Sequence, residues 1–185
     1  METLLQFDAT WTLFFKNLIP VTPFFDMFFS FFSLRGNSIL IWLFVMGFTI
    51  YLEESRNPGI SERDKKFTFV FFVSFFLTSL LTIFILKDIF LRPRPYVEFN
   101  LPSVSKTCPA DFSFPSAHAS TAFAAASVLT FFDKKRKLFY YLIAILIAVS
   151  RIYLGCHYLL DILGGALLGW SISQLTIYLF RKEIK

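Results

Sequence analysis

The chain is dominated by apolar runs whose lengths approach the thickness of a lipid bilayer. Five stand out, at about Asn37 to Leu52, Phe67 to Leu86, Ser116 to Phe132, Leu138 to Val149 and Tyr158 to Phe180. The fourth is short, and we expect it to continue to Leu154. About 20 apolar residues cross the hydrocarbon core as a helix, since only helices or closed barrels satisfy their backbone groups there. Alternating barrel strands are absent. The sequence therefore predicts an all-α, polytopic membrane helix bundle with five transmembrane helices.

Composition agrees with a bilayer environment. Of the 185 residues, 56% are hydrophobic and 17% are charged, and a soluble domain of this size could not bury so much apolar surface. The length favours one domain, so we expect residues 1–185 to form a single integral membrane domain with its transmembrane core over residues 37–180. The net charge of +5 arises mostly in short loops between apolar runs, as membrane orientation requires. We therefore expect no nucleic-acid partner.

Residues 1–36 do not form a continuous apolar span. Charges and prolines interrupt them, namely Lys16, Pro20, Pro23 and Asp26. Because proline breaks a helix, we predict two short helices, one at the interface at about Leu4 to Leu18 and one dipping partly inward at about Phe24 to Leu34. A sixth, broken transmembrane span is the alternative. The first eleven residues carry acidic side chains and no basic cluster, so we expect no cleaved signal peptide.

The positive charges predict the orientation of the helices. They gather in Glu53 to Lys66, in Asp133 to Lys137 and in the C-terminal tail, three segments that lie on one side of a five-helix bundle. The excess of Lys and Arg makes that side cytoplasmic. Residues 87–115 then form an extracytoplasmic active-site loop, since loops of this length are commonly functional. Cys108 and Cys156 either form a bridge on that side or stay unpaired and buried.

Seven polar residues fall at the predicted outer ends of the helices. Both histidines of the chain, His118 and His157, belong to this group. The others are Lys87, Arg94, Ser116, Arg151 and Asp161. Charges near membrane depth are unfavourable unless they are paired or solvated, so they usually mark a functional site. One such histidine alone would more simply be an interfacial residue making a local hydrogen bond.

The first motif of this group is Lys87 to Pro95, with the sequence KDIFLRPRP. We expect Lys87 to close the second helix, and Pro93 to stop the chain from continuing it. Residues seven apart return to nearly the same face of a helix, so Lys87 and Arg94 are expected to converge. Their charges suit phosphate oxygens. Two snorkelling cations are the alternative.

The second motif is Pro115 to Ala119, PSAHA, which opens the third helix. Proline is favoured at a helix start, so Ser116 and His118 are expected in the first turn, whose free amides and dipole can hold an anion. A protonated His118 could donate to a leaving oxygen. A simple helix cap is the alternative for Ser116.

The third motif is Ser150 to Asp161, SRIYLGCHYLLD. His157 and Asp161 are four residues apart and therefore adjacent on a helix. The carboxylate can accept the Nδ1 proton of the imidazole, fix its tautomer and leave Nε2 free to attack. Arg151 lies across a turn at Gly155 and can reach the same anion.

Together these motifs resemble the signature of the type 2 phosphatidic acid phosphatase superfamily. They read Lys87…Arg94-Pro95, Pro115-Ser116-Ala117-His118 and Ser150-Arg151…His157…Asp161, in the order and spacing of that family. Ala117 stands where glycine is usual, and we expect its amide still to face the phosphate.

The resemblance implies a reaction through a phosphohistidine without metal or other cofactor. His157 would be the nucleophile, Asp161 would orient it, and His118 would protonate the leaving group and then activate water. The phosphoryl oxygens would be bound by Lys87, Arg94, Ser116, the Ala117 amide and Arg151. Three cations can replace a metal, and the other carboxylates, Asp88, Glu98 and Asp111, are too scattered in the sequence to bind Mg²⁺.

The expected substrate is a lipid phosphate or diphosphate, because a site at helix ends holds a headgroup while the tails stay in the bilayer. The compact size most resembles bacterial undecaprenyl-diphosphate phosphatases, which implies an inner-membrane protein. Phosphatases of lipid A, phosphatidylglycerophosphate and phosphatidic acid share the same core and are alternatives. Vanadate-dependent haloperoxidases use the same residues but are soluble. A non-catalytic scaffold or lipid transporter predicts that a site residue is missing, and none is.

Overall fold

The computed structural model describes residues 2–33, 36–55, 62–99 and 108–184, and every regular element in these ranges is helical, as predicted. Seven helices are longer than ten residues: α1 (Glu2–Leu18), α2 (Pro23–Ser33), α3 (Asn37–Glu54), α4 (Glu62–Leu81), α7 (Ala117–Phe132), α8 (Lys137–Tyr153) and α9 (Leu159–Ile184). The short ones are the π-helical η1 (Thr82–Leu86), α5 (Lys87–Phe90), α6 (Pro95–Glu98) and the 3-10 helix η2 (Lys134–Arg136). Leu34, Arg56, Lys185 and residues 100–107 of the predicted loop lie outside the described residues.

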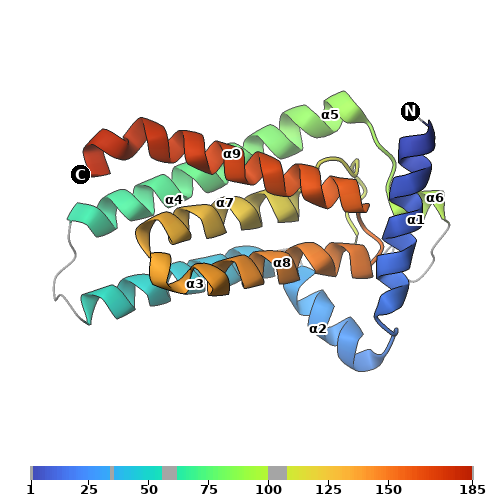
Figure 1. The fold of residues 1–185 in the computed structure, drawn as a ribbon, viewed down its shortest axis with the longest axis horizontal. Coiled ribbons are helices and arrows are strands. Elements are labelled where there is room, and N and C mark those ends of the chain that lie inside the picture. Colours follow the sequence, from blue (N-terminus) through green and yellow to red (C-terminus); the bar gives the residue numbers. More distant parts are fainter. Residues whose placement is uncertain (1, 34–35, 56–61, 100–107, 185) are drawn as a thin grey trace.

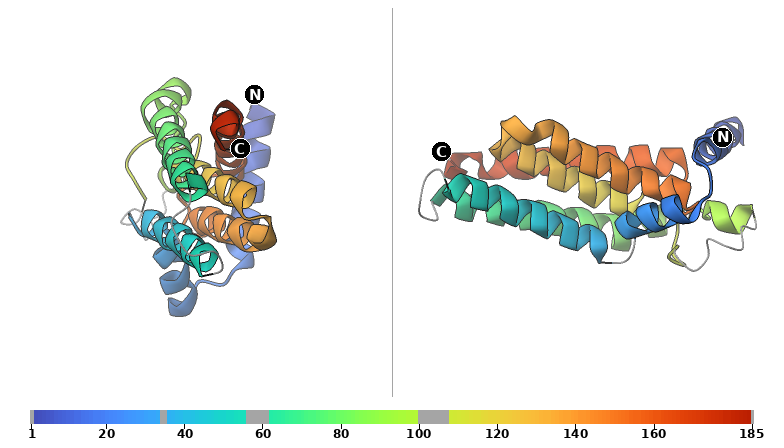
Figure 2. Two further views of the ribbon diagram at one scale, coloured as in Figure 1. Left: turned by 90° about the vertical axis from the view of Figure 1, so that its left-hand side faces the viewer. Right: turned by 90° about the horizontal axis from the view of Figure 1, so that it is seen from below.

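The long helices α3, α4, α7, α8 and α9 run side by side and form an elongated bundle (Figures 1 and 2). By length and apolar composition, Asn37–Glu54, Glu62–Glu98 and Leu159–Phe180 can each cross a membrane, and α7 is a shorter apolar helix. The N-terminal helix α1 lies across one end of the bundle and packs against α8 and α9 (Figure 2). The two short N-terminal helices therefore form close to where the sequence places them.

Small residues let α7 and α9 approach each other closely. The α7 face is built from buried alanines, including Ala119 and Ala124. A Cβ atom on Gly169 of α9 would lie 1.9 Å from the carbonyl oxygen of Ser120, and one on Gly165 would lie 2.6 Å from that of Ser116. Such contact between backbones is typical of small-residue faces in membrane helices. It fixes the start of α7 beside the start of α9.

The second span ends later than predicted. Lys87 does not close it, because η1 and α5 carry the helical chain on to Phe90. None of the three residues after Lys87 is a helix breaker, and the chain turns only at Leu91, whose φ is 48°. The helical conformation is then disfavoured at Arg92 because Pro93 follows. Lys87 is thus held inside a continuous helix, and Arg94 lies in the extended segment beyond it.

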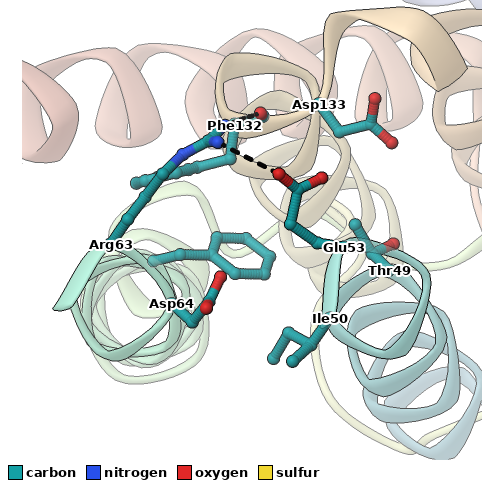
Figure 3. A pocket seen from close by; sticks show the side chains of 8 residues that line it. Thr49, Ile50, Glu53, Arg63, Asp64, Phe132 and Asp133 are labelled. Carbon is teal, nitrogen blue, oxygen red and sulfur yellow. Dashed lines mark hydrogen bonds and ion pairs between the residues drawn. The ribbon is translucent and has the colours of Figure 1, made fainter. Parts of the chain in front are cut away.

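The two ends of the bundle differ in chemistry. The end of α3, the start of α4, the α7–α8 turn and the end of α9 gather at one end of the bundle, as the charge pattern predicts (Figure 1). There Arg63 of α4 donates through Nη2 to the carbonyl of Phe132 at 2.6 Å and through Nη1 to Glu53 at 3.5 Å (Figure 3). The small pocket in Figure 3 is lined by residues of this basic end and contains neither histidine. The candidate site lies at the opposite end.

Candidate active site

His157 stands in the turn between α8 and α9. Gly155 has a φ of 70°, a conformation that glycine adopts without strain. The turn folds back so that the amides of Cys156 and His157 donate to the carbonyl of Arg151, at 2.9 and 3.3 Å. The His157 side chain is thereby buried at the start of α9, and its residue is 1% exposed.

Both ring nitrogens of His157 have a partner. Nδ1 lies 3.3 Å from Oδ2 of Asp161, and Nε2 lies 2.9 Å from Nη1 of Arg94. A guanidinium can only donate, so Nε2 must be the acceptor and the proton must be on Nδ1, facing the carboxylate. Burial lowers the pKa of His157 well below its ordinary 6.5, and the positive charges of Arg94 and Arg151 lower it further. The imidazole is therefore neutral at pH 7, with its Nε2 lone pair pointing at a cation.

Lys87 and Arg94 do converge, although not on one helix face as the spacing predicted, because Arg94 lies beyond the helix end; they meet at Asp111. Lys87 Nζ donates to Oδ2 of Asp111 at 2.6 Å, and Nη2 of Arg94 donates to Oδ1 at 2.5 Å. The Arg94 Nε also donates to the Asp111 carbonyl at 2.6 Å. Burial tends to raise the pKa of Asp111, but its hydrogen bond to Lys87 and the charge of Arg94 outweigh it and the pKa is lowered. Asp111, which the sequence shows only as one of several scattered acids, is thus an ionised partner of both cations.

Arg151 is the third cation of the predicted set and is fully buried at the end of α8. Its Nη1 donates to the carbonyl of Ser33 at 3.2 Å. Its Nε and Nη2 have no hydrogen-bond partner among the described residues. A buried guanidinium with two free donors is unfavourable unless an anion or water completes its hydrogen bonds. The position therefore suits an oxyanion.

The start of α7 carries the remaining predicted residues. Ser116 is the N-cap, and its buried hydroxyl accepts from the amide of Ala119 at 3.5 Å. The Ser116 amide donates to the carbonyl of Asp161 at 3.0 Å, which ties this cap to α9. Ala117 and His118 follow in the first turn, so Ser116 lies one position before the predicted turn. The cap role given above as an alternative for Ser116 is the one its contacts show.

His118 faces a cavity of about 250 Å³ between α3, α4 and α7. The lining includes Gly36, Ile39, Phe75 and Ile83 together with Ala117 and His118. The charges of Arg151, Arg94 and Lys87 act on His118, and the charge of His118 acts in turn on His157. The two histidines and the three predicted cations therefore share one region at this end of the bundle.

A disulfide joins Cys108 to Cys156, with 5.3 Å between their Cα atoms. Of the two states that the sequence left open, the bridged one is present. The bridge attaches the segment that carries Asp111 to the residue before His157.

Two further polar residues at this end were missed by the sequence reasoning. Arg92 is not among the residues predicted for the site, yet its Nη1 donates to Oδ1 of Asp161 at 2.8 Å. Asp8 of α1 is also buried there. For Asp8, the signal in the sequence was a carboxylate within the apolar stretch that forms α1. Within the described ranges, no group of three or more His, Cys, Asp or Glu side chains is arranged to hold a metal ion.

Comparison with known proteins gives consistent relatives. A family model described as the PAP2 superfamily matches residues 66–185. An undecaprenyl-diphosphatase of Sulfolobus acidocaldarius is 31% identical over 138 residues, which cover 74% of this chain and 62% of that protein. Phosphatidylglycerophosphatase B of Bacillus subtilis is 36% identical over 96 residues, covering 46% of this chain and 44% of that protein. The matches thus span about half of these relatives' lengths.

Two solved structures share the fold. The crystal structure of LpxE from Aquifex aeolicus aligns with a TM-score of 0.62 at 27% identity, over 91% of this chain and 93% of that one. The transmembrane PAP2-type phosphatidylglycerolphosphate phosphatase of Bacillus subtilis aligns with a TM-score of 0.60 at 21% identity, over 100% of this chain and 89% of that one.

Proposed function

Because the chain belongs to the PAP2 superfamily, we propose that it is a membrane phosphatase that hydrolyses a lipid phosphate or diphosphate through a phosphohistidine. The arrangement of Arg94, His157 and Asp161 carries the proposal. Nε2 of His157 bears no proton and faces Arg94, the cation that would hold the phosphate, while the Asp161 carboxylate faces Nδ1.

In the first step, Nε2 of His157 attacks phosphorus and the bond to the lipid oxygen breaks. His118 gives its proton to that oxygen, and Asp161 stabilises the positive charge that develops on the His157 ring. In the second step, His118 takes a proton from water, whose oxygen attacks phosphorus and displaces Nε2. Inorganic phosphate leaves, and both histidines return to their starting states.

The phosphoryl oxygens are bound by Lys87, Arg94, Arg151, the Ser116 hydroxyl and the Ala117 amide. Arg151 brings two donors that have no protein partner among the described residues. Arg94 exchanges its hydrogen bond to His157 for one to phosphate, which frees Nε2 for attack. Three fixed cations supply the charge neutralisation that phosphoryl transfer requires, so we expect no metal dependence.

A lipid substrate fits the surroundings of His118. The cavity beside it is lined largely by apolar and small side chains of α3 and α4, helices long and apolar enough to cross a membrane. Undecaprenyl diphosphate is the substrate we favour, because the Sulfolobus acidocaldarius relative bears that activity in its name and is matched over most of this chain. Phosphatidylglycerophosphate and lipid A are the competing substrates.

The site faces the extracytoplasmic side. The basic loops at the opposite end support this orientation. The disulfide at the catalytic end supports it too, since disulfides persist in oxidising compartments.

The test is phosphate release by the detergent-solubilised protein from undecaprenyl diphosphate, phosphatidylglycerophosphate, phosphatidic acid and lipid A, with and without excess chelator. We expect activity with at least one substrate, unchanged by chelator and abolished in His157→Ala. The matched control is Asp88→Asn, which alters an exposed carboxylate of α5. Trapping of the phosphoenzyme at another residue, or strict dependence on Mg²⁺, would refute the mechanism.

A further inference from the structure

Helix α1 reaches the catalytic end through two buried side chains. Asp8 and Thr12 are four residues apart on one face of α1, and each is 1% exposed. Oδ1 of Asp8 accepts from the amide of Leu160, and the Thr12 hydroxyl accepts from the amide of Leu159, both at 2.9 Å. The first amides of a helix need such acceptors. A helix distant in the sequence therefore caps α9, the helix that carries Asp161.

Arg92 connects this cap to the catalytic carboxylate. Its Nη1 donates to Oδ1 of Asp161 at 2.8 Å, and its Nη2 donates to Oδ2 of Asp8 at 2.7 Å. Its guanidinium carbon lies 3.9 Å from the centre of the Tyr158 ring. Because the guanidinium is planar and rigid, the two carboxylates are held at a fixed separation.

The two carboxylate oxygens of Asp161 have different partners. Oδ2 faces Nδ1 of His157 and accepts from the amide of Tyr158 at 2.9 Å. Oδ1 is bound by Arg92. A carboxylate held at only one oxygen could turn about its bond, and the contact to His157 would lose its direction.

We propose that Asp8 and Arg92 are positioning residues that orient the Asp161 carboxylate against His157 and set the charge it presents. The proposal rests on the proposed roles of His157 and Asp161. Arg92 alone would cancel the charge of Asp161, whereas the group of Asp8, Arg92 and Asp161 retains one net negative charge next to the imidazole.

This arrangement makes opposite predictions for two variants. Asp8→Asn keeps an oxygen for the Leu160 amide but leaves the charge of Arg92 unbalanced, so the pKa of His157 should fall. Arg92→Gln removes a positive charge, so that pKa should rise. The other charged or titratable groups around His157 are the same in both variants, namely Lys87, Arg94, Arg151, His118, Asp111, Tyr158 and Glu98.

The experiment is titration of the histidine ring nitrogens by NMR in detergent micelles, together with kcat and KM. The chain has two histidines, so His118→Gln assigns the signals. We expect pKa shifts of opposite sign, and a decrease in kcat of roughly 10- to 100-fold with KM nearly unchanged, because the geometry of the nucleophile is disturbed while phosphate contacts remain. Arg92→Lys keeps the charge but cannot bridge both acids, so it should restore the pKa and leave kcat low.

The control is Asp88→Asn, which removes an exposed carboxylate, and thermal unfolding of every variant checks the fold. Shifts of the same sign, or no shift with kcat intact, would overturn the proposal. A wild-type protein that hydrolyses no lipid phosphate would refute the proposed function instead, and the ring titration would still decide this inference.

Discussion

The chemistry of His157 follows from its surroundings more than from its own side chain. The ring is buried, Arg94 lies at one nitrogen and Asp161 at the other. Burial and cations oppose protonation, while the carboxylate fixes the tautomer. The same cations that bind an oxyanion thus keep the nucleophile unprotonated before the substrate arrives.

We predict a bell-shaped dependence of kcat/KM on pH, with its acid limb below pH 6.5. The pKa of His157 lies well below its ordinary 6.5. A base with a lowered pKa stays neutral as the pH falls through 6.5, so activity should persist there and be lost only at lower pH. The basic limb reports the loss of the proton that His118 must donate, a proton that the negative charge of the bound phosphate helps the ring to keep against the neighbouring cations. Initial rates across pH 3 to 9 test this, and a profile that stays flat over that whole range contradicts the assignment of both roles.

At this scale the sequence predicts the residues with catalytic spacing but misses those that support them. His157 lies in the turn just before α9 and Asp161 lies in the first turn of that helix, so their spacing of four residues was still sufficient to predict their contact. Asp111, Arg92 and Asp8 act through contacts between segments 17 to 152 residues apart. No local sequence pattern predicts contacts between such distant segments, so these pairs are seen only in the folded chain.

Among the elements, α7 and α9 set the precision of the site. Their backbones come close together at Gly165 and Gly169, and the Ser116–Asp161 backbone hydrogen bond lies at the same interface. The three motifs can meet around one region because these backbones nearly touch.

We predict that Gly169→Ala destabilises the protein, whereas Gly47→Ala does not. The new methyl at residue 169 would lie 1.9 Å from the Ser120 carbonyl oxygen, so a backbone must move, at a cost of about 1–3 kcal/mol. Gly47 of α3 has no atom within 4 Å of the added carbon, and alanine there should stabilise the helix by up to about 1 kcal/mol. Thermal unfolding in detergent compares the two variants. Equal effects would contradict close packing at this interface.

Most helix positions could be predicted from apolar length, because the bilayer requires it. The end of the second span could not. Its last turn depends on η1 and on Leu91 with a positive φ, a conformation that few side chains favour. The pairing of α7 with α9 could not be predicted either, because a small-residue face permits close packing without specifying which helix packs against it.

At the scale of the whole molecule, charge and chemistry are separated along the bundle. The basic turn at Lys134–Arg136 lies at one end (Figure 1). The start of α7 and the turn between α8 and α9, which carry the two histidines, lie at the other. This polarity sets the leaflet in which a lipid headgroup can be hydrolysed.

We predict that a membrane-impermeant maleimide labels Val97→Cys but not Lys135→Cys in intact cells. Both residues are exposed, and they lie at opposite ends of the bundle. The two native cysteines form a disulfide and do not react. Lysed cells provide the control, since both variants should then be labelled. The reverse pattern in intact cells would place the site in the cytoplasm.

We also predict that reduction of the Cys108–Cys156 bridge lowers both stability and kcat. A cross-link over 48 residues stabilises a fold by about 2–4 kcal/mol. Without it, the position of Asp111 relative to His157 depends on non-covalent contacts, chiefly those of Arg94. Activity and thermal unfolding with and without dithiothreitol test this. The double variant Cys108→Ser/Cys156→Ser should have the same activity and thermal stability as the reduced protein, and dithiothreitol should change neither.

The cross-link also makes the finished catalytic end depend on oxidation. The cation anchor at Asp111 and the nucleophile at His157 are joined covalently only after two thiols have been oxidised. On the proposed orientation, we expect a newly inserted chain to reach full activity only once its catalytic end meets an oxidant outside the cytoplasm.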